Sequence, residues 1–146
     1  MNQIAGIHCL IELFDCPFGL LDNENFIREA VATASVESGS TLISLSSHQF
    51  SPQGVTALGL LAESHISIHT WPETGYAAAD VFTCGIHCDP KRAGIYLSEA
   101  LQSKRHTFTI LQRGKEALAN IVAFPCREDH AEEESCVRAN HHPPYG

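Results

Sequence analysis

Reactive side chains are concentrated in residues 63–73, ESHISIHTWPE. Serines alternate there with His65 and His69, and a carboxylate follows at Glu73. A serine beside an imidazole can act as a nucleophile whose proton the imidazole accepts. Two histidines can instead bind a metal ion, or polar residues at every second position can cover the solvent-exposed face of a strand. The segment therefore allows three interpretations: a nucleophile, a metal site or a solvated strand face.

The spacing of the histidines disfavours a metal site. On a strand, His65 and His69 share a face but lie about 13 Å apart, because a strand rises about 3.3 Å per residue. A loop containing Cys84, His87 and Cys88 could supply ligands, but no matching pair occurs elsewhere at zinc-like spacing. We therefore expect no metal.

A nucleophile in this segment needs partners from a neighbouring strand. If residues 64–70 pair with residues 76–84 through the turn at residues 71–75, Cys84 returns to the start of the motif, close to Ser64. A shift in register would undo this placement. The sequence has no G-x-S-x-G segment, which disfavours a hydrolase with a Ser-His-Asp triad.

The elements that must position these residues are mostly strands. β-branched and aromatic residues, with partial alternation, predict six of them, and glycine and proline mark the turns near residues 16–19, 52–54 and 71–75. The predicted strands are residues 6–14, 41–50, 55–62, 64–70, 76–84 and 106–112, of which residues 55–62 are expected to be buried.

Two helices are predicted between the strands. The first follows a cap at Asp22 or Asn23, has apolar residues at helical spacing and ends near Gly39. The second begins after Asp89, which a proline follows, and runs to about Gln102. The order of elements is thus βαββ followed by ββαβ.

This order predicts an α+β fold, a two-layer α/β sandwich with an antiparallel sheet and helices on one face. We expect two pseudo-repeated βαββ-like halves, each a small antiparallel sheet with one helix. The other face of the sheet would be solvated or covered by a partner, which favours a homodimer. The 146 residues suit a single catalytic domain over residues 1–126, followed by a polar, acidic, flexible tail over residues 127–146 that includes His141 and His142.

Composition excludes several classes of partner. The formal net charge is −8 and there is no dense run of lysine and arginine, so nucleic acid and anionic membranes are poor partners. The N-terminal segment lacks a basic region, its apolar run contains Glu12 and Asp15, and no apolar stretch is long enough to span a bilayer. We expect a cytoplasmic protein whose six cysteines are reduced thiols.

The segment ESHISIHTWPETGYAAADVFTCG, residues 63–85, resembles the signature of the S-adenosylmethionine decarboxylases of bacteria and archaea, which are made as proenzymes. The resemblance includes HQFSPQGVTALGLLA, residues 48–62, and spans about residues 6–113. It implies decarboxylation of S-adenosylmethionine to the aminopropyl donor of spermidine synthesis. The cofactor implied is a pyruvoyl group, an electron sink like pyridoxal phosphate.

The resemblance also implies that the chain cleaves itself, and it implies roles for the residues near the cleaved bond. The chain would cleave itself between Glu63 and Ser64 into residues 1–63 and 64–146, and Ser64 would become the pyruvoyl group that forms a Schiff base with the substrate. His69 matches the base that removes a proton from Ser64 during processing. Cys84 matches the proton donor in decarboxylation.

Further residues match substrate and processing positions of the family. Phe50 and His69 match the pair that sandwiches adenine, and Glu73 matches the carboxylate that binds the ribose hydroxyls. Thr56 stands where the family often has a serine, and its hydroxyl could stabilise the oxyoxazolidine intermediate of self-cleavage. Strict alternation places Ser64 opposite His69, so we expect the chain to leave regular strand geometry at the cut.

Two alternatives remain at the level of sequence. A pyruvoyl-dependent decarboxylase of arginine or ornithine would share the processing motif, although Phe50 and Glu73 favour a nucleoside. A protein of another class, an uncleaved metal-binding or interaction domain, would keep the fold without the chemistry. It predicts an uncut chain and bound zinc.

Overall fold

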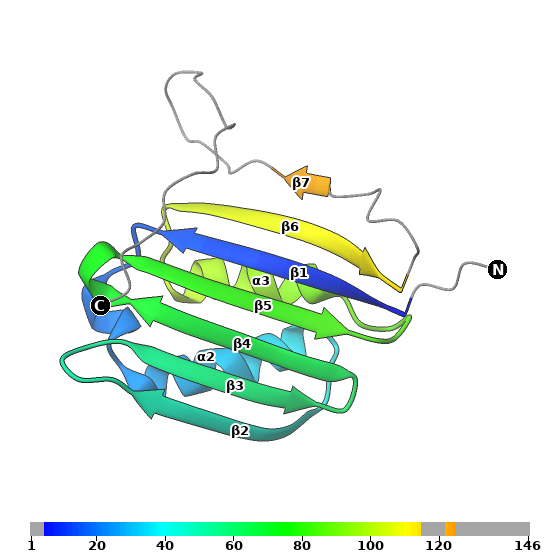
Figure 1. Cartoon of the computed structure of the whole chain (residues 1–146), viewed down its shortest axis with the longest axis horizontal. Coiled ribbons are helices and arrows are strands. Elements are labelled where there is room, and N and C mark those ends of the chain that lie inside the picture. The colour runs from blue at the N-terminus through cyan, green and yellow to red at the C-terminus, as the bar shows by residue number, and fades with distance from the viewer. Residues whose placement is uncertain (1–4, 115–121, 125–146) are drawn as a thin grey trace.

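The computed structural model describes residues 5–114 and 122–124, in which seven strands form one antiparallel sheet (Figure 1). Their order across the sheet is β2-β3-β4-β5-β1-β6-β7. The predicted strands are confirmed to within two residues at each end, and the short β7 was not predicted. The bounds are β1 (Gly6–Phe14), β2 (Leu42–Gln49), β3 (Val55–Leu61), β4 (Ser64–Trp71), β5 (Tyr76–Thr83), β6 (Arg105–Arg113) and β7 (Val122–Phe124).

The helices begin at side chains that cap them. Asn23 accepts a hydrogen bond from the backbone N–H of Phe26 at 3.0 Å, and Asp89 accepts one from that of Lys91 at 3.0 Å. These caps start α2 (Glu24–Glu37) and α3 (Pro90–Ala100). The predicted turns also contain short helices, α1 (Phe18–Leu21) and the 3-10 turn η1 (Pro72–Thr74). None of the helices in the described part of the chain is long and apolar enough to cross a membrane.

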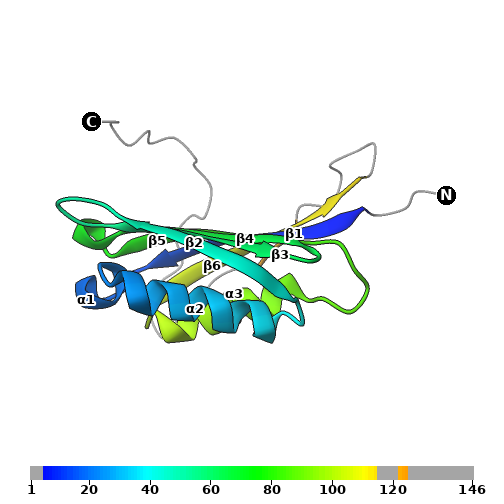
Figure 2. The same ribbon diagram turned by 90° about the horizontal axis from the view of Figure 1, so that it is seen from below.

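All three α-helices lie on one side of the sheet, which confirms the predicted two-layer α+β fold (Figure 2). Alternate strand residues such as Ile11, Ile66 and Val81 are fully buried in the core that the helices cover. Gly59 of β3 lets side chains of the neighbouring strands pack closely, because a Cβ there would lie 2.7 Å from Cγ2 of Ile66 on β4 and 3.1 Å from Cδ1 of Leu42 on β2. We call the opposite surface of the sheet the open face.

The strand order differs from the expected arrangement in one respect. The two halves have the predicted order of elements, but β1 lies between β5 and β6 and does not pair with β2 or β3. The connection through α2 carries the chain from β1 to β2 at the edge of the sheet. The halves therefore interleave in one continuous sheet, because element order alone does not specify which strands become neighbours.

The strand at residues 55–62 also differs, because it is only half buried. Val55 and Ala57 face the helices, whereas the side chains of Leu58 and Leu60 are 54% and 53% exposed on the open face. An apolar run therefore does not show that both faces of a strand are covered. The expected tail, residues 127–146, lies outside the described residues, as do Cys126, Cys136, His141 and His142.

Candidate active site

The Glu63–Ser64 bond lies at the tight turn that joins β3 to β4. Leu61 pairs with Ser64, so two residues form the turn. Ser64 has φ 155, a conformation that is essentially restricted to glycine and costs on the order of 1–3 kcal/mol. The predicted departure from regular strand geometry at this position is confirmed.

The end of β5 lies directly beside this bond. Ser64 pairs with Thr83, and the backbone N–H of Cys84 donates a hydrogen bond to the carbonyl oxygen of Glu63 at 3.0 Å. The predicted return of Cys84 to the start of the motif is therefore confirmed. An N–H in this place can stabilise negative charge on the carbonyl oxygen if a nucleophile attacks the carbon.

The thiols differ in their surroundings. Cys84 is exposed, whereas Cys9 is fully buried and its burial raises the pKa of that thiol to about 12. Burial likewise raises the pKa of the Cys16 thiol, to about 11. Among the cysteines that the structure describes, Cys84 is the exposed one, and it lies beside the Glu63–Ser64 bond.

A hydrogen-bonded chain of side chains begins at Ser64 and runs across the open face. Oγ of Ser64 lies 3.3 Å from Nδ1 of His65, and Nε2 of His65 lies 2.9 Å from Oδ2 of Asp80. The same oxygen lies 2.6 Å from Nε2 of His8. We call Ser64, His65, Asp80 and His8 the relay.

Asp80 is the charged centre of the relay. Burial would raise the pKa of its carboxyl, but hydrogen bonds from Ser67, His8 and His65 outweigh this effect and hold the pKa below its usual range. The carboxylate is therefore ionised at neutral pH. His8 and Asp80 could not be predicted from the sequence, because only the pairing of β5 with both β1 and β4 brings them to His65.

The relay residues are also the ones that could hold a metal. Within the described ranges 5–114 and 122–124, the ligand atoms of His8, His65 and Asp80 lie within 4.8 Å of one another. Both imidazoles, however, already direct a nitrogen at the same carboxylate oxygen. We therefore interpret the group as a hydrogen-bonded cluster. Cys84, His87 and Cys88 form no such ligand group in this part of the chain.

Another set of predicted residues gathers around His69, near the other end of β4. Thr56 pairs with His69, and its hydroxyl contacts Nδ1 of that imidazole. The ring of His69 lies 5.6 Å from that of Phe50 and 4.2 Å from that of Trp71, centre to centre. Burial lowers the pKa of His69, and the nearby carboxylate of Glu73 opposes this shift.

Within one chain, the relay and the residues around His69 do not come together. Ser64 and His69 are five residues apart on the same strand, which corresponds to about 16 Å. A hollow of ≈ 340 Å³ on the open face lies between the two ends of β4. Its lining includes Leu10, Glu12, Thr56, Leu58, His69 and Asp80. One protomer therefore holds two partial sites joined by a shallow hollow.

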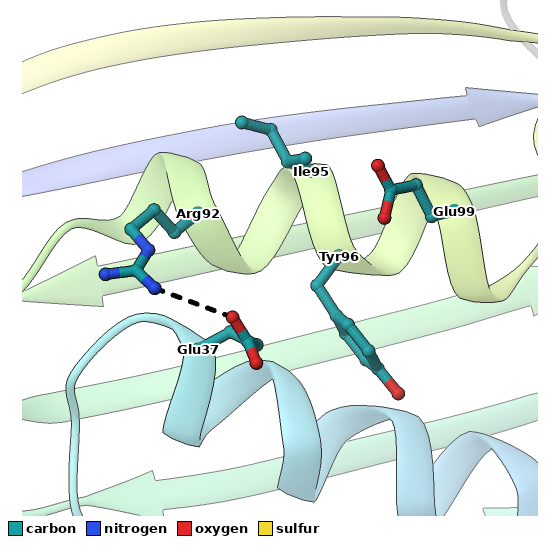
Figure 3. A pocket seen from close by; sticks show the side chains of 5 residues that line it. All are labelled: Glu37, Arg92, Ile95, Tyr96 and Glu99. Atoms are coloured by element: carbon teal, nitrogen blue, oxygen red, sulfur yellow. Dashed lines mark ion pairs between the residues drawn. The ribbon is translucent and has the colours of Figure 1, made fainter.

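A second hollow lies on the helical side, between α2 and α3 (Figure 3). Arg92 and Glu37 form an ion pair across it at 3.6 Å, beside Ile95, Tyr96 and Glu99. These residues are separated from Ser64 by the sheet and do not include a serine or cysteine nucleophile. The open face is therefore the candidate active site.

Known proteins share this combination of fold and motif. The family described as S-adenosylmethionine decarboxylase matches residues 7–114. An S-adenosylmethionine decarboxylase proenzyme of Parasynechococcus marenigrum (strain WH8102) is 53% identical over 123 residues, which cover 84% of this chain and 96% of the relative. One of Prochlorococcus marinus (strain MIT 9211) is 56% identical over 110 residues, 75% of this chain and 90% of the relative.

A solved structure extends the similarity to the fold. The crystal structure of the adenosylmethionine decarboxylase from Aquifex aeolicus matches with a TM-score of 0.70 and 37% identity, over 90% of this chain and 99% of that one. Sequence and fold thus agree over the residues that form the open face. The chain belongs to the S-adenosylmethionine decarboxylase family of carboxy-lyases.

Proposed function

We propose that this protein decarboxylates S-adenosylmethionine with a pyruvoyl group that it makes from its own Ser64. The observation that carries the proposal is the geometry at the turn, where Ser64 has φ 155 and the Cys84 N–H holds the Glu63 carbonyl oxygen. The similarity to proteins named as proenzymes supports a chain that is processed. The same names favour S-adenosylmethionine over arginine or ornithine.

Self-cleavage would give two chains that stay together. Residues 1–63 would keep β1, β2 and β3, and residues 64–146 would keep β4, β5 and β6. β1 pairs with β5 and β6, and β3 pairs with β4, so hydrogen-bonded ladders join the two products on both sides. An α-keto carbonyl at residue 64 supplies the electron sink that decarboxylation of an amino acid requires. The exposed Cys84 thiol would return a proton to the substrate carbon.

The set of residues around His69 suits the nucleoside of the substrate. The rings of Phe50, His69 and Trp71 contact one another, so an adenine would stack on an outer face of this group or enter after Phe50 and His69 separate. Aromatic faces also attract the sulfonium cation. Glu73 is exposed in η1 beside them, where its carboxylate can accept hydrogen bonds from the ribose hydroxyls.

A homodimer would unite the two partial sites. Ser64 and His69 lie about 16 Å apart in one chain, both partial sites open to the same face, and that face exposes Leu58 and Leu60. If two copies pack by these faces around a two-fold axis that crosses the strands, the Ser64 end of each β4 meets the His69 end of the other. We propose that each active site combines Ser64 of one protomer with His69 of the partner subunit.

Denaturing intact-mass spectrometry tests the proposed processing. We expect two chains, residues 1–63 and a pyruvoyl-started chain from position 64, and a single uncut chain for Ser64→Ala. An unaltered chain that stays whole on incubation would contradict the proposal, and bound zinc in such a chain would favour the metal-binding alternative. For the processed protein, competition between S-adenosylmethionine, arginine and ornithine in a CO₂-release assay identifies the substrate.

A further inference from the structure

We propose that His65 is the general base that accepts the proton of the Ser64 hydroxyl in self-cleavage, and that Asp80 positions it. This inference rests on the proposed cleavage and assigns its first step to residues of the same chain. The atoms are in place in the uncut chain, because Nδ1 of His65 lies 3.3 Å from Oγ of Ser64. This is the separation of a weak hydrogen bond, which a small rotation of either side chain shortens.

The partners of His65 fix which of its nitrogens carries a proton. Oδ2 of Asp80 lies 2.9 Å from Nε2, and an ionised carboxylate only accepts hydrogen bonds. Nε2 must therefore carry the proton of the neutral ring, which leaves Nδ1 with a free lone pair that faces Ser64. A carboxylate orients the base in the same way in Ser-His-Asp triads.

Two further hydrogen bonds hold the Asp80 carboxylate in place. Nε2 of His8 donates to Oδ2, and Ser67 donates to Oδ1. NH1 of Arg113 lies 3.0 Å from Nδ1 of His8, which keeps the proton of His8 on the nitrogen that faces Asp80. The side chains of His8 and Asp80 are 14% and 24% exposed, whereas that of His65 is 46% exposed. The carboxylate is thus anchored, and the base remains accessible at the cut.

The proposed step conserves all atoms and charges. Oγ of Ser64 forms a bond to the carbonyl carbon of Glu63 while its proton moves to Nδ1 of His65. The carbonyl oxygen becomes negative and accepts the hydrogen bond from the Cys84 N–H, which already points at it. The intermediate collapses, the C–N bond breaks, and the amine of Ser64 takes the proton back from His65. The product is an ester with a free amine, and nothing has been added or lost.

Two different protons leave Ser64 in the proposed processing. The first leaves Oγ when the ester forms, and the second leaves Cα when the ester is eliminated. Within its own chain His69 can reach neither proton, since it lies about 16 Å along the strand, whereas Nδ1 of His65 lies 3.3 Å from Oγ. We therefore assign ester formation to His65 and elimination to His69 of the partner subunit, and the two steps can be distinguished by experiment.

The test follows fresh precursor from cell-free synthesis by intact mass, with and without hydroxylamine, which cleaves esters but not amides. We expect His65→Ala to slow cleavage by at least about 100-fold, with no hydroxylamine-sensitive ester. Asp80→Asn keeps the shape of the side chain and should slow cleavage by at least about tenfold. His69→Ala should accumulate the ester, and added imidazole should restore cleavage of the His65→Ala chain. His87→Ala, an exposed histidine outside the relay, is the matched control.

The outcomes separate this inference from the proposed function. A His65→Ala chain that cleaves at the rate of the unaltered chain would overturn the role of His65, and so would one that accumulates the ester. If His65→Ala does not fold by circular dichroism, the Asp80→Asn chain decides, and an unchanged rate there overturns the inference. If the unaltered chain does not cleave at all, the proposed function fails instead.

Discussion

Cys84 offers two separate groups to the site, a backbone N–H and a thiol. The N–H donates to the Glu63 carbonyl oxygen, and the thiol is exposed beside the cut. Cys84→Ala keeps the N–H and should therefore cleave like the unaltered chain, but loss of the proton donor should lower turnover by at least about 100-fold. Intact mass measures the first effect and CO₂ release the second. Cys88→Ala is the control, and unchanged turnover of Cys84→Ala would exclude the thiol as the donor.

The protonation of His69 gives a second prediction for a single residue. Burial lowers its pKa, so the ring remains neutral at pH values where an ordinary histidine, with a pKa of about 6.5, is already protonated. The Glu73 carboxylate raises the pKa in opposition. Glu73→Gln removes that charge and should shift the titration of His69 to still lower pH.

Nuclear magnetic resonance of the uncut Ser64→Ala chain measures this titration directly. The His69 signal is assigned by its loss in His69→Gln. Glu37→Gln is the control, because Glu37 lies on α2 and pairs with Arg92 on the other side of the sheet. An unchanged His69 titration in Glu73→Gln, or a shift to higher pH, would show that the two side chains do not interact as the structure indicates.

The sequence predicts part of the site because part of it depends on local geometry. A hairpin between β4 and β5 brings Cys84 back to Ser64, and alternation requires an irregular backbone at Ser64. The relay could not be predicted in this way. It needs His8 of β1 beside Asp80 of β5, two residues more than 70 positions apart, and no periodicity in either strand specifies that neighbour.

At the scale of elements, Gly59 leaves room for side chains of the two neighbouring strands on the face of the sheet that the helices cover. A Cβ at this position would lie 2.7 Å from the Ile66 side chain, inside any normal contact distance. Gly59→Ala should therefore lower the free energy of unfolding by about 1–3 kcal/mol, as overpacking does. Urea unfolding in the Ser64→Ala background, which remains one chain, measures the change.

Gly19→Ala is the matched control for this change. Gly19 lies in α1 and has no atom within 4 Å of the position of an added Cβ. Because alanine favours a helix more than glycine does, this variant should be as stable as its parent or more stable by up to about 1 kcal/mol. If Gly59→Ala were equally stable, the close contacts of Gly59 with Ile66 and Leu42 would not be a real constraint.

The elements were predictable from sequence, and their neighbours were not. Caps at Asn23 and Asp89 and the alternation in β4 are local signals, and each corresponds to an observed element. The insertion of β1 between β5 and β6 depends on long-range pairing. It requires crossovers through α2 and α3, and the order of elements leaves several such arrangements open.

At the scale of the whole molecule, the open face combines two features. It carries the reactive residues, and it exposes Leu58, Leu60 and Phe50 at 54%, 53% and 40%. A second copy would cover these apolar side chains and also bring Ser64 to a His69. The same packing would thus stabilise the proposed dimer and complete the proposed site, and cleavage would then depend on assembly.

Co-expression of two inactive variants tests this dependence. The Ser64→Ala chain keeps His69 and has no bond to cut, whereas the His69→Ala chain keeps Ser64 and lacks the second base, so neither should be processed alone. In a mixed dimer, Ser64 of one protomer meets His69 of the partner subunit. Intact mass should therefore show cleavage of the His69→Ala chain only.

A second mixture distinguishes the two bases. Because His65 lies next to Ser64 in its own chain, the His65→Ala chain should stay uncut when it is co-expressed with the Ser64→Ala chain, although that partner supplies an intact His65 and His69. Cleavage in the first mixture without cleavage in the second would place His69 across the dimer and His65 within the chain. If neither mixture cleaved although mixed dimers form, the site would not be shared between protomers, and His69 would have to reach Ser64 by a rearrangement of β4.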